Sequence, residues 1–218
     1  MGFLDHFLGR KQRRVAVAEP RAVVRPPTGF LSWVMLAGPD GERVPCIMRR
    51  LMPADVMALS TWPAPTYFDW LGLVESRSRG RPTRATVNYD KPLRLEVLET
   101  LPFPDSPAQI VGAMALCDRP KDRPDALELA YLEKHPSSPL AGFGTAALAL
   151  AITEARTRKM NFFLDALIKS DSHVFYRRCG MVEVDGTPWP TVTVRMEFPS
   201  AERAEAFLDR AREKQIVP

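Results

Sequence analysis

The chain has 218 residues, of which 45% are hydrophobic and 26% charged, and its formal net charge is +4. A chain of this length is expected to fold as one domain with additions, and its apolar share is enough for a sizeable core. No apolar run reaches the roughly 18 residues of a membrane-spanning helix, and the first residues lack the pattern of a secretion signal. Three widely spaced cysteines match neither a disulfide framework nor a zinc site and predict a cytoplasmic protein.

The positive charge is concentrated at the N-terminus. Residues 1–28 contain six basic and two acidic side chains, a net charge of +4, so residues 29–218 sum to zero. We expect residues 1–28 to form a basic, flexible tail, and we expect the single folded domain to cover residues 29–218. The tail either remains solvated or makes a weak contact with RNA or an anionic membrane.

Turn signals divide the folded part into short elements. The first is a pair of strands on either side of the turn at residues 39–41, followed by a helix over 53–60. Further along, the pattern predicts strands over 93–101, 109–117 and 126–134, a helix over 144–159, a strand over 161–167, a helix over 170–180, strands over 182–185 and 191–198, and a helix over 200–214. This mixed order predicts an α/β (α+β) domain around one central sheet.

The segment 61–92 is rich first in aromatic residues and then in arginine. The aromatic side chains suit either core packing or the wall of a pocket; they are Trp62, Tyr67, Phe68 and Trp70. The arginines stand among Gly, Pro and Ser residues, which predicts a mobile loop; they are Arg77, Arg79, Arg81 and Arg84.

The loop before the 144–159 helix ends in Gly142-Phe143-Gly144-Thr145, and no acidic residue occurs between Pro136 and Glu154. The first amides of a helix have no internal partner and lie at the positive end of the helix dipole. Glycine lets an anion approach the backbone closely. We interpret the loop as a cradle for a diphosphate, with a plain strand-to-helix turn as the alternative.

This run resembles the GNAT superfamily of acyl-CoA-dependent N-acyltransferases, whose phosphate loop reads Gln/Arg-x-x-Gly-x-Gly/Ala. Gly142 and Gly144 stand at the two glycine positions, and "VFYRRCGM" is similar to the family's aromatic-Tyr-x-x-x-Gly segment, with Tyr176 at the tyrosine. Glu128 precedes Gly142 at an offset near that of the general-base glutamate in the histone-acetylating branch. The resemblance covers roughly residues 93–198 and implies a central mixed, mostly antiparallel sheet flanked by helices.

The resemblance also implies an activity, the transfer of an acyl group from acetyl-CoA or another acyl-CoA to an amine, with no metal. Glu128 is expected to accept the amine proton and Tyr176 to protonate the departing thiolate. Glu133, at an odd separation from Glu128, is expected on the opposite face of its strand. Cys179 is expected to be a packed small residue. The cofactor-binding residues that the resemblance implies are Leu132, Lys134, Leu140, Ala141, Gly142, Phe143, Gly144 and Thr145.

Two departures from the family pattern keep alternatives open. Pro139 replaces the Gln or Arg of the phosphate loop, and Lys134 stands where the family has an apolar strand residue. A GNAT-like module with weak catalysis, binding through its basic tail, is therefore one alternative. A dinucleotide-binding domain is another, because Gly142-x-Gly144-x-x-Ala147 fits that fingerprint. The acceptor amine belongs to a small molecule or a protein, and a homodimer is compatible with the sequence.

Overall fold

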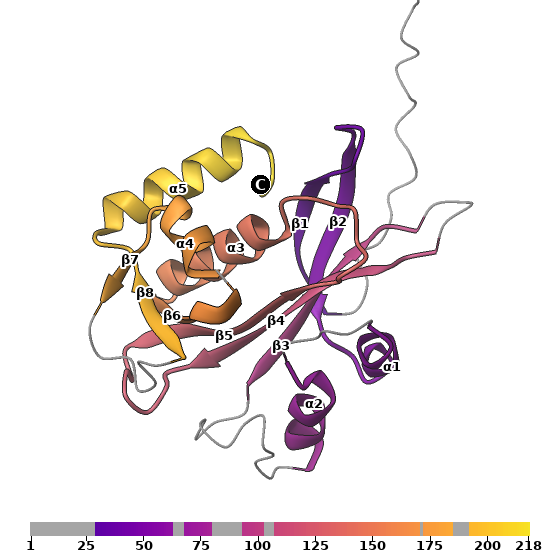
Figure 1. Ribbon diagram of the computed structural model, residues 1–218, viewed down its shortest axis with the longest axis horizontal. Helices are drawn as coiled ribbons and strands as arrows, with labels where there is room; N and C mark the ends of the chain where they lie inside the picture. The colour runs from indigo at the N-terminus through magenta and orange to yellow at the C-terminus, as the bar shows by residue number, and fades with distance from the viewer. Residues whose placement is uncertain (1–28, 63–67, 80–92, 103–106, 171, 185–191) are drawn as a thin grey trace, which may run out of the picture.

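The computed structural model describes residues 29–62, 68–79, 93–102, 107–170, 172–184 and 192–218 (Figure 1). The predictions for residues 1–28, Tyr67, Arg81 and Arg84 fall outside these ranges. The strands are β1 (Phe30–Ala37), β2 (Arg43–Arg50), β3 (Arg94–Thr100), β4 (Ile110–Asp118), β5 (Ala126–Lys134), β6 (Asn161–Leu167), β7 (Val182–Val184) and β8 (Thr193–Glu197). The helices are α1 (Asp55–Ser60), α2 (Trp70–Arg79), α3 (Phe143–Thr157), α4 (Ser172–Cys179) and α5 (Ala201–Glu213), with a 3-10 turn at Ile168–Ser170.

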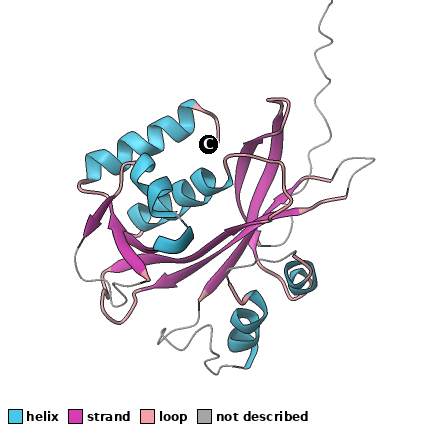
Figure 2. Ribbon diagram, in the orientation of Figure 1, coloured by secondary structure: helices cyan, strands magenta, loops and turns pink. Residues whose placement is uncertain are grey.

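The strands form one sheet in the order β1-β2-β3-β4-β5-β6-β8-β7. Only the β5–β6 pair is parallel among the strand pairs of the described residues, and the other neighbours are antiparallel. Helices α3, α4 and α5 cover one face of the sheet, and α1 and α2 cover the other (Figures 1 and 2). The predicted mixed, mostly antiparallel sheet flanked by helices is therefore confirmed.

Each face of the sheet has its own hydrophobic core. The face under α3 is mainly aliphatic, because α3 contributes a run of alanines and leucines whose members are almost fully buried. The face under α1 and α2 is built from tryptophans packed on small and branched strand residues, with Trp62 7% and Trp70 3% exposed. Burial of both faces explains why the central strands are apolar along most of their length.

Helix α2 corrects the first part of the mobile loop predicted for residues 76–84, because residues 76–79 are helical, and the rest of that prediction falls outside the described residues. The helix starts after Asp69, whose side chain accepts a hydrogen bond from the Gly72 amide at 2.8 Å, and continues to Arg79. Trp70 and Leu73 are 3% and 2% exposed, so burial against the sheet stabilises a helix that local propensity does not favour. Asp69 acts as an N-cap of the helix, a signal that the prediction of a loop did not use.

Helix α5 forms as predicted. The Ser200 side chain accepts a hydrogen bond from the Arg203 amide at 3.4 Å, and the predicted face of Ala204, Phe207, Leu208 and Ala211 is buried. Beyond the helix, the Arg43 guanidinium donates to the carbonyl oxygens of Lys214 and Gln215, which ties the end of the chain to the β1–β2 hairpin. None of the helices in the described ranges is long and apolar enough to cross a bilayer.

Candidate active site

The two parallel strands at the middle of the sheet pair over only a short stretch. Their register holds at three positions, the last of which joins Glu128 to Phe163. Within the described residues, β5 then continues to Lys134 beside β4, and β6 continues to Leu167 beside β8, with no further pairing between them. The facing edges of the two strands therefore carry backbone groups that can bond to a ligand.

The start of α3 follows directly on β5 and its loop. Gly142 is the N-cap residue, with a φ of 97°, and the first turn of α3 has no acidic residue. The Ala146 amide bonds to the Gly142 carbonyl at 2.9 Å, as the first turn of an α-helix requires. The amides of residues 142–145 precede that bond, so they point beyond the helix at the positive end of its dipole. This arrangement fits an anion such as a diphosphate.

The rest of the loop uses its amides within the protein. The Ser138 amide donates to the His135 carbonyl at 3.0 Å, and the Leu140 amide donates to the Ser138 hydroxyl at 3.4 Å. Ala141 and Ala37 exchange two backbone hydrogen bonds, which fix the loop to β1. The amides of Leu140 and Ala141 are therefore engaged, and the donors that remain for a ligand begin at Gly142.

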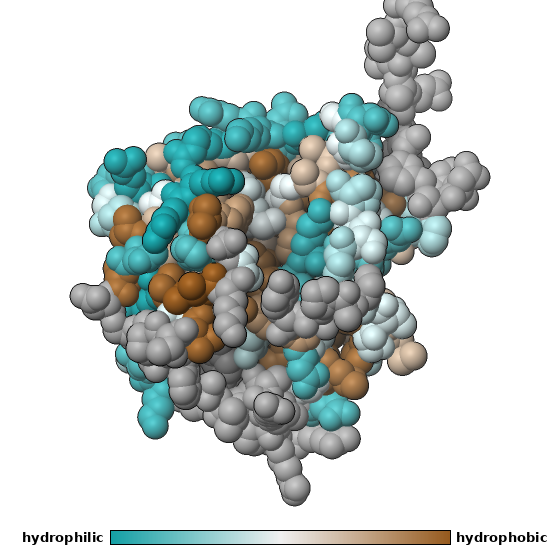
Figure 3. All heavy atoms as spheres, viewed as in Figure 1, coloured by the Kyte–Doolittle hydropathy of each residue, from teal (hydrophilic) through white to brown (hydrophobic). Residues whose placement is uncertain are grey.

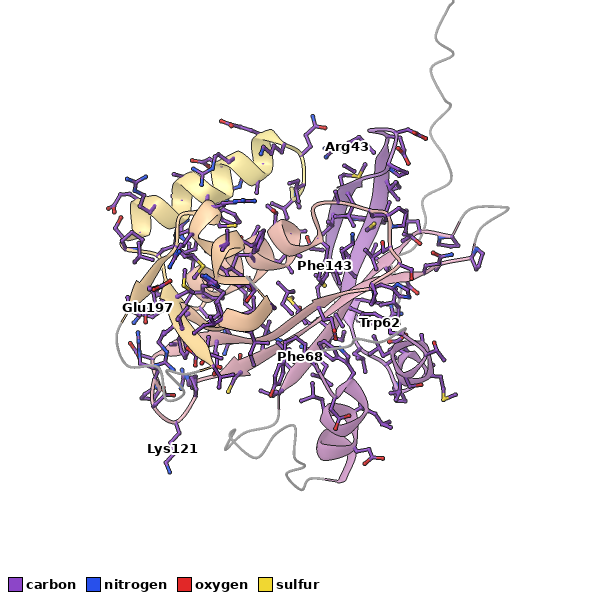
Figure 4. The ribbon with its side chains drawn as sticks, viewed as in Figure 1. Arg43, Trp62, Phe68, Lys121, Phe143 and Glu197 are labelled. Atoms are coloured by element: carbon purple, nitrogen blue, oxygen red, sulfur yellow. The ribbon has the colours of Figure 1, made fainter. Side chains whose placement is uncertain are left out.

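Residues 142, 143 and 144 have different structural roles in the loop. Gly142 requires glycine by its positive φ and not for lack of space, because a Cβ there would make an ordinary contact with Leu36 Cδ2 at 3.7 Å. At Gly144 a Cβ would lie 3.0 Å from Phe175 Cζ, so this glycine makes room for α4. Phe143 turns into the core between α3 and the sheet and packs on Gly112 (Figure 4).

Tyr176 lies in α4 on the α3 face of the sheet. Its side chain is 6% exposed, and its ring meets Phe175 edge to face, with centroids 5.0 Å apart. Burial raises the pKa of the phenol well above its usual value, and the neighbouring Cys179 thiol adds to the rise. The phenol is protonated at neutral pH and can donate a hydrogen bond, although the raised pKa makes it a weaker acid than an exposed tyrosine.

Glu128 lies at the last position where β5 and β6 pair, and only 7% of the residue is exposed. It pairs with Cys117 across β4, and directly paired residues face the same side of a sheet, so its side chain lies on the α1–α2 face. Its partner Phe163 is fully buried there beneath the Arg195 guanidinium, whose Cζ lies 4.4 Å from the ring centroid. Glu128 therefore stands at the closed end of the opening, on the face opposite Tyr176.

Glu133 lies on the same face as Glu128, which corrects the predicted opposite orientation. The register between β4 and β5 shifts between Ala115 and Leu116, so that Ala130 is an extra residue in β5. A bulge of this kind changes the alternation of side chains by one position. The β5 side chains that lie towards α3 are those of Leu127, Leu129 and Leu132. Regular alternation would place them two residues apart, so the spacing of three between Leu129 and Leu132 is the sequence signal for the bulge.

The Glu133 carboxylate contacts one member of a chain of aromatic side chains. The Trp70 indole nitrogen donates a hydrogen bond to Glu133 Oε2 at 2.6 Å, and both residues are buried. Phe68 lies between Trp70 and Tyr131, with ring centroids 6.2 Å and 4.7 Å away. Phe68 and Trp62 lie on the α1–α2 side of the sheet (Figure 4). The described members of the predicted aromatic cluster therefore pack in this core. They also lie next to the part of β5 that no longer pairs with β6.

The remaining candidates take ordinary places. Lys134 is exposed at the end of β5, whereas Leu132 is half-buried towards α3 and Thr145 is half-buried in its first turn. Burial raises the pKa of the Cys179 thiol to about 11, so it is protonated and packed, as expected. Within the described ranges, no group of three or more His, Cys, Asp or Glu residues is arranged to hold a metal ion.

No protein-family model matches the chain, and the search of curated proteins finds no match. Solved structures do match. A chimeric spermidine N-acetyltransferase from Vibrio cholerae SpeG and hSSAT superposes with a TM-score of 0.51 at 16% identity, covering 76% of this chain and 99% of that one. The GNAT domain of S. lividans PAT has a TM-score of 0.49 at 14% identity, covering 80% and 99%. The first of these likenesses, together with the sheet order and the opening, shows that the chain has the GNAT fold.

Proposed function

We propose that the protein is an acyl-CoA-dependent N-acyltransferase, with acetyl-CoA or another acyl-CoA as donor. The observation that carries the proposal is the parting of β5 and β6 beyond Glu128. The opening lies between the uncommitted amides at the start of α3 and a buried carboxylate on the opposite face. An extended thioester fits between the strand edges, with its diphosphate at residues 142–145.

Two groups supply the proton transfers. An amine with a pKa near 10.4 is almost entirely protonated at neutral pH, so Glu128, directly or through water, removes a proton before the nitrogen attacks. The nitrogen then attacks the thioester carbonyl, and the C–S bond breaks as the tetrahedral intermediate collapses. Tyr176 donates a hydrogen bond to the departing thiolate, which takes up the second proton that the nitrogen loses. The bulge at Ala130 adds a backbone amide outside the regular ladder, suited to polarising the thioester carbonyl.

The amine acceptor is proposed to approach from the α1–α2 face. That face holds Glu128 and, further along the same strand, the Glu133 carboxylate, which accepts a hydrogen bond from Trp70 next to Phe68. Aromatic faces and a carboxylate together attract a cation, so the acceptor is proposed to be a protonated amine on a small molecule or a protein.

The sheet does not favour the dinucleotide-binding alternative. That class of domain has a doubly wound parallel sheet, whereas the strand pairs of the described residues are antiparallel except for β5 with β6. The alternative of a weak binding module remains a prediction, and it rests on Lys134 and on Pro139, whose ring nitrogen has no hydrogen to donate.

The test combines binding with turnover. Calorimetry of the full chain with acetyl-CoA is expected to show saturable binding, and thiol release is expected with at least one amine from a panel of spermidine, a peptide with a free N-terminus and a lysine-containing peptide with a blocked one. Saturable binding without thiol release would favour the weak binding module. Absence of binding to acetyl-CoA, free CoA and longer acyl-CoAs would overturn the proposal.

A further inference from the structure

A pocket of about 260 Å³ lies where α3 begins and where α4 and α5 come together. Thr145 in the first turn of α3, Phe175 of α4 and Phe207 of α5 contribute to its wall. The pocket falls somewhat below the roughly 300–1,000 Å³ typical of complete ligand sites, so it suits one end of a ligand. Thr145 belongs both to this wall and to the group of amides at residues 142–145, so a ligand held by those amides extends directly into the pocket.

Cations surround this pocket. Arg178 of α4 and Arg210 and Lys214 of α5 line it, and the described residues of the wall include no carboxylate. Arg210 uses one nitrogen to donate to the Cys179 carbonyl at 3.2 Å, which holds the guanidinium at the rim. Hydrophilic residues gather over α5 on the molecular surface (Figure 3). A site with three positive groups beside a helix N-terminus selects an anion.

Neighbouring arginines on the same helices differ in that they are paired. Arg177 of α4 forms an ion pair with Glu183, and Arg212 of α5 forms ion pairs with Glu205 and Asp209. For Arg178 and Lys214, the described part of the chain contains no ion pair. Cations near the ends of α4 and α5 also suit the helix dipoles. That explanation applies to each helix separately and does not account for the meeting of both ends over one pocket beside α3.

We propose that this pocket binds the 3′-phosphate-bearing adenosine end of CoA, so that α5 forms part of the cofactor site. The proposal rests on the proposed function, and it adds a cationic clamp from Arg178, Arg210 and Lys214. The clamp supplies charge that the phosphate loop lacks, because Pro139 stands where the family pattern has Gln or Arg. Phe175, half-buried at the wall, offers an apolar surface for the purine.

Calorimetry of the full chain with CoA and with dephospho-CoA, which lacks the 3′-phosphate, tests the clamp. Wild type is expected to bind CoA about tenfold more tightly than dephospho-CoA. Arg178→Met and Lys214→Met are each expected to weaken CoA binding about three- to tenfold and to leave dephospho-CoA binding unchanged. Arg212→Met removes the same charge from α5 outside the pocket and is expected to change neither affinity.

The outcomes separate the two proposals. If wild type binds CoA and dephospho-CoA equally, or if the variants lose both ligands equally, the clamp is overturned while the acyltransferase proposal stands. An effect of Arg212→Met as large as that of Lys214→Met would show general attraction by the helix and would also overturn the clamp. If wild type binds neither ligand, both proposals fail.

Discussion

The two faces of the central sheet differ in where their charges lie. Six charged side chains are buried within the described residues, namely Arg49, Asp55, Glu96, Glu128, Glu133 and Arg195. Their strand partners and contacts place five of them on the α1–α2 face, and only Glu96 beneath α3. On the α3 face, the polar groups available to a ligand are instead the backbone amides at the start of α3.

This difference shows how the fold divides the proposed chemistry. A diphosphate can be held by helix amides, which need no particular side chains, so the α3 face can be built from alanine and leucine. Proton transfer from an amine needs a titratable side chain in a partly desolvated place, and such groups are stable in a core only when they are paired or hydrogen-bonded. The α1–α2 face meets that condition with aromatic donors and ion pairs.

The largest expected effect comes from Glu128→Gln. Loss of a general base typically lowers turnover about 10²- to 10⁴-fold, and acetyl-CoA affinity should remain within about twofold because the cofactor lies on the other face. Glu133→Gln is the comparison variant, since it changes a second buried carboxylate on the same strand face and keeps an acceptor for the Trp70 indole. Because Glu133 is proposed to attract the amine, its loss should raise the KM for the amine and leave kcat within about twofold, whereas Glu128→Gln should lower kcat. Thiol-release rates measure both. Equal losses in the two variants would contradict a specific role for Glu128.

Arg49→Met tests whether the buried charges of the α1–α2 face depend on their partners. Arg49 contacts Asp55 at 2.6 Å and Glu99 at 2.8 Å, and its side chain is 7% exposed. Removing one partner of a buried pair leaves the other unpaired, so the free energy of unfolding should fall by about 3–5 kcal/mol. Urea denaturation measures the loss. The double variant Arg49→Met/Asp55→Asn should recover part of it, and a failure to recover would point to lost packing instead.

Glu96→Gln tests the acid that is buried beneath α3. Burial raises the pKa of Glu96 to about 7, against the opposing effect of Arg94. A carboxyl whose pKa is raised in the folded state stabilises the protein below its unfolded pKa near 4.5, and this stabilisation is lost as the pH rises through 7. Between pH 5 and 8, wild-type stability should fall relative to the variant by about 2–3 kcal/mol. If wild type and Glu96→Gln differ in stability by the same amount at every pH, the raised pKa of Glu96 is contradicted.

The smallest expected effects on stability come from substitutions of Gly142 and Gly144, and they distinguish the roles of these two residues. Gly142→Ala should lower the free energy of unfolding by about 1–2 kcal/mol, because alanine is strained at positive φ. In Gly144→Ala the new methyl group requires only a small shift of the Phe175 ring, so a loss below about 1 kcal/mol is expected. Thermal unfolding compares the two variants. A larger loss for Gly144→Ala would mean that packing against α4, and not the backbone turn, determines this loop.

Much of the fold and part of the site follow from local sequence patterns. The strand at 126–134, the strand at 161–167 and the final helix are all formed close to their predicted bounds. These segments are periodic and bounded by turn residues, so their structure depends on neighbours in the chain. The turn at Gly142 could be predicted from the sequence for the same reason. Helix α2 was not predicted as a helix, because its stability comes from burial of Trp70 against the sheet.

The sequence by itself determined most of the strands and helices, α2 excepted, and that an acid-free helix start follows β5, because these are local properties of the chain. Only the tertiary structure decided that β5 and β6 part after Glu128, that the bulge at Ala130 brings Glu133 to the face of Glu128, and that α5 reaches the start of α3. Strand register and helix docking depend on the packing of residues far apart in the sequence, and a single sequence gives little direct information on such contacts.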